Sequence, residues 1–139
     1  GLQNVLYLGN LDAKRDWGYA PEYVEAMWMM MQQDKPEDFV ISTGQNHTIR
    51  EFVELAFREV DINIEWKGGG LDEIGIDSKT GQKVVEINPE YFRPTEVEQL
   101  LGDSSKANKM LGWKARTKIE ELVKIMVKAD WEKVKKRGY

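Results

Sequence analysis

Apolar positions along the chain fall into short continuous runs and into stretches with helical spacing. Residues 5–8 and 38–43 are largely apolar runs followed by a glycine, a pattern that predicts two buried strands. Residues 62–66 alternate between apolar and polar side chains, as a half-buried strand does. Residues 74–77 and 83–88 flank a polar turn that contains a glycine, so they predict a β-hairpin.

Two segments in the first half of the chain have the spacing of helices. Residues 21–33 begin with a proline, which suits the first position of a helix because the N–H that it lacks would be unpaired there. Apolar side chains cover more than one stripe of this segment, so we expect a helix that is buried on most sides. Thr48 and Glu51 have capping-box spacing, and the apolar residues from there to Val60 lie on one helix face.

The last third of the chain also carries helix signals. Two further pairs have capping-box spacing: Thr95 with Glu98, and Thr117 with Glu120. Gly102 and Gly112 stand where the C-terminus of a helix favours a left-handed residue. Apolar residues at helical spacing after Thr117 predict a long final helix. The order of the elements predicts an α/β fold of mixed helices and short strands.

Length and composition limit the class of protein. The chain has 139 residues, of which 41% are apolar and 32% charged, as expected for one folded domain. It contains no cysteine, which excludes disulfides and thiolate chemistry. The longest apolar run, residues 26–31, is far shorter than the roughly 20 residues that a membrane span needs. No signal-like segment precedes it, so we predict a cytoplasmic protein with no membrane partner.

The charge of −4 is unevenly distributed. Residues 1–100 carry 9 Lys and Arg against 19 Asp and Glu, whereas residues 101–139 carry 11 against 5. Lysines near the basic end alternate with apolar residues at helical spacing, which favours a solvated helix face over a site for an anionic partner. The acidity of the whole chain argues against nucleic-acid binding.

Several common catalytic devices are missing from the sequence. The single histidine, His47, has no partners for a Ser-His-Asp relay or for a histidine-based metal site. Residues 68–70 are glycines after a predicted strand, but Glu73 stands where a dinucleotide-binding loop has its last glycine. No phosphate-binding P-loop is present, and no tyrosine is followed by a lysine four residues later. We therefore expect neither catalytic residues nor a metal site in this chain.

Two polar segments, residues 8–17 and 91–98, each place an arginine next to a turn or a proline. A guanidinium group binds phosphate oxygens through two parallel hydrogen bonds, so Arg15 and Arg93 together could hold a diphosphate. Glu96, three residues after Arg93, could accept hydrogen bonds from a ribose diol. The alternative is structural: Arg15 pairs with Asp12 or Asp16, and Arg93 pairs with Glu96.

Five segments of the chain carry a recognisable pattern: residues 8–18, 36–44, 91–98, 100–103 and 111–114. Together they resemble the GDP-mannose 4,6-dehydratase family. The similarity extends from about residue 5 to about residue 131, nearly the whole chain. The pattern departs from the family at Tyr19, where the family commonly has histidine after Trp-Gly.

The resemblance implies a fold and a division into domains. Members of this family are extended short-chain dehydrogenase/reductase enzymes, with a larger Rossmann domain that holds NADP and the catalytic residues. A smaller lobe binds the GDP end of the substrate. Residues 1–139 resemble the later, C-terminal part, which implies the substrate-binding lobe without the N-terminal NADP-binding domain. Residues 21–44 would then supply the last Rossmann helix and strand.

The resemblance also implies an activity and a set of site residues. The intact enzyme would remove water from GDP-mannose to give GDP-4-dehydro-6-deoxy-mannose, a step toward GDP-fucose, while NADP takes and returns a hydride. The implied substrate-binding residues are Leu8, Gly9, Asn10 and Ala13 around the nucleotide, Arg15 and Arg93 at the diphosphate, and Glu96 at the ribose. No catalytic or cofactor-binding residue is carried over, so this chain alone is expected to be inactive.

Three other functions are compatible with the same residues. A stand-alone GDP-sugar-binding module would keep Arg15, Arg93 and Glu96. A related GDP-sugar epimerase or reductase would keep them too, with its catalytic residues elsewhere. A structural or oligomerisation domain would have no nucleotide affinity. Without further chain to cover it, the helix at residues 21–33 would expose part of its Met and Trp surface, so we also expect a homo-oligomer.

Overall fold

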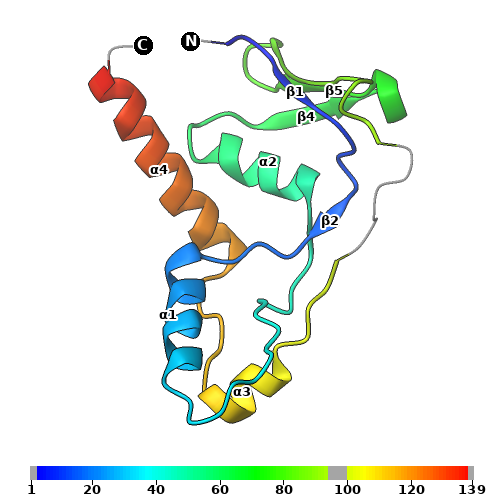
Figure 1. The fold of residues 1–139 in the computed structure, drawn as a ribbon. Coiled ribbons are helices and arrows are strands. Elements are labelled where there is room, and N and C mark those ends of the chain that lie inside the picture. The colour runs from blue at the N-terminus through cyan, green and yellow to red at the C-terminus, as the bar shows by residue number, and fades with distance from the viewer. Residues whose placement is uncertain (1–2, 94–99, 138–139) are drawn as a thin grey trace.

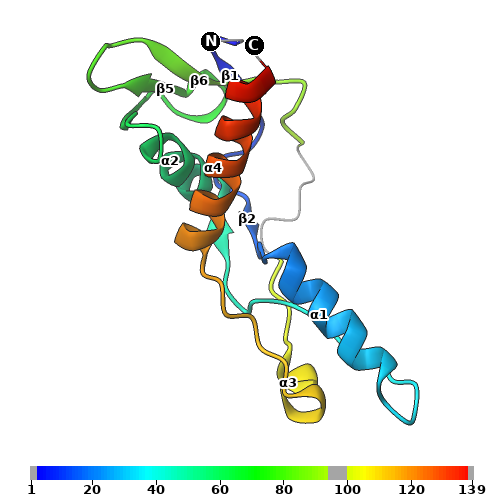
Figure 2. The same cartoon turned by 90° about the vertical axis from the view of Figure 1, so that its left-hand side faces the viewer.

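The computed structural model describes residues 3–93 and 100–137 and has an upper and a lower part (Figure 1). The upper part holds a small β-sheet and two helices. The lower part holds two further helices and a long extended segment. A two-stranded ladder lies between the parts, and a turned view shows the same division (Figure 2).

The upper sheet has four strands in the order β1-β6-β5-β4. They are β1 (Leu6–Leu8), β4 (Ile64–Lys67), β5 (Ile74–Asp77) and β6 (Lys83–Ile87). β1 runs parallel to β6 with Leu8 opposite Ile87, whereas β5 is antiparallel to both of its neighbours. The predicted hairpin is confirmed as β5 and β6, and two other predicted strands are confirmed as β1 and β4. Because β1 and β6 are parallel, their carboxyl ends lie at the same edge of the sheet.

The two-stranded ladder connects the chain that follows β1 to a helix. β2 (Lys14–Arg15) pairs with β3 (His47–Thr48), and α2 (Ile49–Arg58) begins directly after β3. The hydroxyl of Thr48 accepts a 3.0 Å hydrogen bond from the N–H of Glu51, which confirms the predicted N-cap.

The second helix of the upper part is α4 (Ile119–Arg137), which packs along α2 (Figures 1 and 2). Ile119, Leu122 and Val123 form the buried centre of their interface. The partly buried side chains around that centre include Trp17, Phe52 and Leu55. The Trp17 and Phe52 rings lie 4.9 Å apart, so the polar loop before α1 is anchored in this core.

The lower part is built around a single tryptophan. α1 (Ala20–Met31) packs on α3 (Ser105–Leu111), and Ala26, Ala107 and Trp113 form the buried centre. The indole N–H of Trp113 donates a 2.8 Å hydrogen bond to the carbonyl of Glu22, so this large ring is buried without an unpaired donor. Gly112, with φ +69°, ends α3 in the predicted left-handed conformation.

The strand predicted at residues 38–43 is not formed. This segment is extended but has no ladder partner in the described part of the chain, and Val40 is 54% exposed. A strand needs a neighbour for its backbone hydrogen bonds, and nothing in the sequence pattern reveals whether one is available. The helix at residues 21–33 is also less buried than predicted. In α1 only Glu22 and Ala26 are buried, and its exposed apolar side chains are Val24, Met27, Trp28 and Met31.

Two helix-end predictions are wrong, and one lies outside the described residues. Gly102 is not left-handed; a Cβ there would lie 2.5 Å from the Cβ of Ser42, so glycine permits a close approach. Thr117 does not cap α4 through Glu120. Its N–H and hydroxyl both donate to the carboxylate of Glu22. The pair Thr95–Glu98 falls within residues 94–99, which the structure does not describe.

Candidate functional site

The two polar segments singled out in the sequence meet at the carboxyl ends of β1 and β6. The N–H of Asn88 donates a 2.8 Å hydrogen bond to the carbonyl of Leu8. One residue later the backbones almost touch, because a Cβ on Gly9 would lie 2.4 Å from the carbonyl oxygen of Tyr91. Glycine is therefore required at this contact, which brings residues 8–10 directly beside the segment that leads to Arg93.

The loop after Gly9 is fixed by its own polar groups and by α2. The side-chain oxygen of Asn10 accepts a 2.9 Å hydrogen bond from the N–H of Asp12, which closes a turn. The carbonyls of Leu11 and Ala13 accept hydrogen bonds from the first N–H groups of α2. Both of these apolar side chains are buried. The side chain of Ala13 therefore packs inside the protein, and the predicted role of Ala13 at the nucleotide stays a prediction.

Arg15 lies at the end of β2, opposite His47 in the ladder. One of its terminal nitrogens donates a 2.8 Å hydrogen bond to the carbonyl of Lys14. Its side chain lines a hollow of about 370 Å³ together with Asp16 and Tyr23. Burial, followed by the charges of Asp16 and Glu22, raises the pKa of Tyr23, so its hydroxyl remains a hydrogen-bond donor over the physiological range.

The carboxylates that the structural alternative assigned to Arg15 have other partners. Asp16 accepts hydrogen bonds from the N–H and hydroxyl of Thr43 and from the N–H of Gly44. These bonds tie the loop before α1 to the end of the extended segment. Asp12 accepts a 3.0 Å hydrogen bond from Arg50.

Arg93 is exposed and follows the turn after β6. The convergence of Arg15 and Arg93 on one diphosphate stays a prediction. Glu96 lies outside the described residues, so both its predicted contact with a ribose and its alternative pairing with Arg93 stay predictions.

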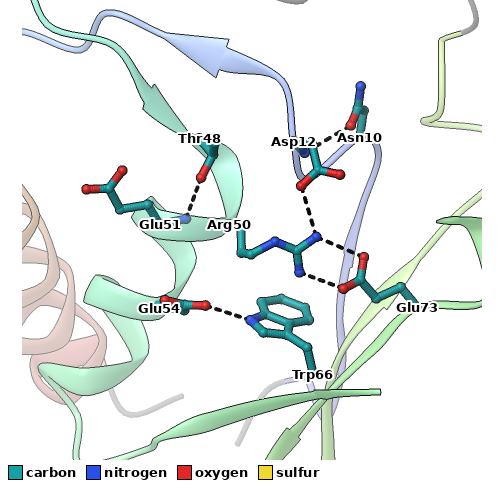
Figure 3. Close-up of polar contacts among 8 residues, drawn as sticks. All are labelled: Asn10, Asp12, Thr48, Arg50, Glu51, Glu54, Trp66 and Glu73. Atoms are coloured by element: carbon teal, nitrogen blue, oxygen red, sulfur yellow. Dashed lines mark hydrogen bonds and ion pairs between the residues drawn. The ribbon is translucent and has the colours of Figure 1, made fainter. Parts of the chain in front are cut away.

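A cluster around Arg50 was not predicted from the sequence (Figure 3). Its guanidinium donates two hydrogen bonds to Glu73, at 2.6 and 3.0 Å, besides the one to Asp12. It also lies 4.8 Å from the centre of the Trp66 ring, and the Trp66 indole N–H donates to Glu54 at 2.7 Å. One arginine thus connects α2 with the β1–β2 loop, with β4 and with the start of β5.

The bonds to Glu73 are the main cause of a raised pKa for Arg50, with Asp12 contributing in the same direction. Arg50 and Glu73 are 23 positions apart and Glu73 was considered only as a missing glycine, so no spacing rule links them. The one sequence feature that could have drawn attention to Arg50 is the Thr48–Glu51 capping box, because it places residue 50 in the first turn of a helix.

The described residues do not form a dinucleotide-binding loop. The glycines at residues 68–70 follow β4 but lead into a short 3₁₀ turn, η1 (Gly70–Asp72), rather than into an α-helix whose N-terminus could hold a pyrophosphate. Within residues 3–93 and 100–137, no group of three or more His, Asp or Glu side chains is arranged to hold a metal ion. No helix in the same part of the chain has both the length and the apolar character to cross a membrane.

Solved structures define the class of protein to which this fold belongs. UDP-glucose 4-epimerase from Thermotoga maritima matches with a TM-score of 0.71 and 21% identity, over 94% of this chain and 36% of the epimerase. RMD from Pseudomonas aeruginosa, solved with NADPH, matches with a TM-score of 0.69 and 18% identity, over 94% of this chain and 36% of that protein. The chain therefore shares the mixed α/β fold of about a third of each of these two proteins.

Sequence comparison narrows the class to a family. Residues 1–126 match the family model of GDP-mannose 4,6 dehydratase, and the chain belongs to this family. It is 56% identical over 135 residues to GDP-mannose 4,6 dehydratase from Dictyostelium discoideum, which covers 97% of this chain and 38% of that relative. It is 57% identical over 129 residues to the Drosophila melanogaster enzyme of that name, covering 93% of this chain and 33% of that relative. The chain therefore spans about a third of the length of these relatives.

Proposed function

We propose that this chain is the nucleotide-sugar-binding portion of a GDP-mannose 4,6-dehydratase and that it binds the GDP moiety of GDP-mannose. The complete enzyme would convert this substrate into GDP-4-dehydro-6-deoxy-mannose. The match of residues 1–126 to the family model carries the proposal. The close contact of Gly9 with Tyr91 supports it, because this contact puts the two predicted binding segments side by side.

The residues of the site have distinct parts in this proposal. The backbone of Leu8, Gly9 and Asn10 would line the nucleotide pocket at the carboxyl end of β1, the usual place for a ligand in an open α/β sheet. Asn10 uses its side-chain oxygen to close the loop, so its NH₂ group would donate to the nucleotide. Arg15 and Arg93 would each hold phosphate oxygens through a charge-assisted pair of hydrogen bonds.

The cofactor and the reacting groups have a different location in this proposal. The glycine run of this chain does not fit a dinucleotide, because it opens a 3₁₀ turn and not a helix. NADP and the catalytic residues would therefore belong to parts of the enzyme beyond this chain, and this chain alone would be inactive. What the present residues supply is the grip on the GDP end of the substrate. A cytoplasmic location stays a prediction.

The exposed face of α1 supports a role in a larger assembly. Met27, Trp28 and Met31 are all more than half exposed and lie on one helix. The extended segment that follows this helix has no strand partner among the residues that the structure describes. Such a surface is unfavourable in water. We propose that it is covered by further chain or by a second copy, and that this chain alone forms homo-oligomers.

The test is a turnover assay with the complete polypeptide that contains this sequence. With GDP-mannose and NADP, we expect a product that has lost one water and retains GDP, identified by mass spectrometry. UDP-mannose and dTDP-mannose serve as matched substrates that differ only in the nucleotide. Failure to act on GDP-mannose, or equal activity on all three nucleotide sugars, would contradict the proposal.

A further inference from the structure

The Arg50 cluster has a rigid side and an exposed side. Glu73 is largely buried, with 13% of its side chain exposed, and it accepts two of the guanidinium's hydrogen bonds. Trp66 lies against the guanidinium and is itself held by Glu54 (Figure 3). Asp12, in contrast, is 77% exposed and belongs to the loop. Glu73 and Trp66, both partly buried, therefore fix the position of Arg50, and Arg50 in turn holds Asp12.

The backbone of the same residue holds the same loop. The N–H of Arg50 donates a 2.9 Å hydrogen bond to the carbonyl of Leu11, and the N–H of Ile49 donates a 3.1 Å bond to that of Ala13. These N–H groups belong to the first turn of α2, where no helical carbonyl is available to them. The loop thus satisfies the start of α2, and α2 fixes the loop at three consecutive points.

The position of this loop also determines the position of Arg15, the residue predicted to bind phosphate. Asp12 and Ala13 lie three and two residues before Arg15, at the entrance of the β2 ladder. A displacement of the loop would therefore change both the pocket lining at Asn10 and the direction of Arg15. Ion pairs at the surface contribute little to stability, and the pair with Asp12 is exposed. The Arg50–Asp12 pair can nevertheless hold the loop in one position, because positioning the loop is distinct from stabilising the fold.

We propose that Arg50 is a positioning residue for nucleotide binding: held by Glu73 and Trp66, it fixes the loop of residues 8–15 in the conformation that binds the nucleoside diphosphate. This inference rests on the proposed function. Arg50 does not contact the nucleotide. It acts through Asp12 and through the backbone of the loop.

The experiment measures GDP binding by calorimetry and GDP-mannose turnover with the complete polypeptide. Arg50→Lys keeps the charge but cannot bridge two carboxylates with a planar fork. We expect the Kd for GDP and the KM for GDP-mannose to rise about tenfold, the loss expected when one charge-assisted hydrogen bond to the ligand is misplaced. We expect kcat to stay within about twofold, because a residue that only orients the bound end of the substrate leaves the chemical step unchanged.

Two further variants separate positioning from folding. Asp12→Asn removes only the exposed charge of the loop, and we expect a rise in Kd with no change in melting temperature. Glu37→Gln breaks an exposed pair with Lys106 in the lower part of the protein, away from the predicted site, and should change neither quantity. A purely structural role would lower the melting temperature and the binding stoichiometry of Arg50→Lys while Kd stays constant, and this result would overturn the inference alone. Absence of GDP binding in the unmodified protein would overturn the proposed function as well.

Discussion

Glu22 connects the lower helix to the segment before α4 through a buried carboxylate. The side chain belongs to the first turn of α1, and the residue is 6% exposed. It accepts hydrogen bonds from the N–H of Arg116 at 3.1 Å, from the N–H of Thr117 at 3.2 Å and from the hydroxyl of Thr117 at 2.9 Å. Two of these donors are backbone groups that would otherwise be unpaired, so we expect Glu22→Gln to lower stability markedly.

The magnitude follows from the geometry. Glutamine keeps one acceptor oxygen, which can serve the two groups of Thr117, but its NH₂ then faces the N–H of Arg116. This bond is partly buried, and leaving its donor unpaired costs about 1–3 kcal/mol. For a chain of 139 residues, the entropy of unfolding is about 0.3 kcal/mol per degree. We therefore expect the melting temperature to fall by about 3–10 °C, centred near 7 °C for a loss of about 2 kcal/mol.

Thermal unfolding followed by circular dichroism measures this shift. Glu25→Gln is the matched control, because Glu25 lies on the same helix and pairs with the same Arg116 but is much more exposed. An exposed pair contributes less than about 1 kcal/mol, so the control should lose no more than about 3 °C. Equal shifts for the two variants would refute the argument that burial of the carboxylate and its backbone donors sets the cost.

Three further predictions concern Gly9 after β1, Asp77 at the end of β5 and Trp28 on the exposed face of α1. Gly9→Ala should destabilise the protein by about 1–3 kcal/mol in urea unfolding, because its Cβ would meet the Tyr91 carbonyl, whereas Gly69→Ala, with open space around it, should be nearly neutral. Hydrogen bonds from the N–H of Lys79 and then from a threonine hydroxyl lower the pKa of Asp77 below its ordinary value of 3.8. Its stabilising effect is therefore present above that value and lost as the pH falls through the lowered pKa. Asp77→Asn should accordingly destabilise the protein at pH 7 and destabilise it progressively less as the pH is lowered below 3.8. A loss of stability that is the same at every pH would contradict this prediction. Trp28→Gln should shift the oligomers expected for this chain toward monomer in light scattering, and an unmodified chain that is monomeric at high concentration would contradict the role given to α1.

The sequence predicts those parts of the fold that depend on local patterns. The hairpin of β5 and β6, the N-cap at Thr48 and the left-handed end of α3 at Gly112 all follow from residue type and spacing. The strand predicted at residues 38–43 is not formed, because strand formation also depends on a neighbour that no local pattern reports. Thr117 shows a similar limit, since its hydroxyl binds the distant Glu22 in place of its own helix.

Some parts of the candidate site could likewise be predicted from local sequence patterns, and others could not. Residues 8–15 and the segment around Arg93 were found because arginine beside turns is a chemical signal that the sequence displays. Their contact at Gly9 and Tyr91 depends on parallel pairing of β1 with β6, which joins segments about 80 positions apart. The Arg50 cluster could not be predicted, because its three partners come from separate parts of the chain and share no spacing.

The most direct test of the account compares GDP with guanosine as ligands of the complete polypeptide, in calorimetric titrations of the unmodified protein, Arg15→Ala and Arg93→Ala. If the two guanidinium groups hold the diphosphate, each substitution raises the Kd for GDP by about 10- to 100-fold and leaves guanosine binding unchanged. If GDP binding is unaffected, or if guanosine binding weakens by the same factor, the diphosphate is held by other groups and the assignment of these two arginines is wrong.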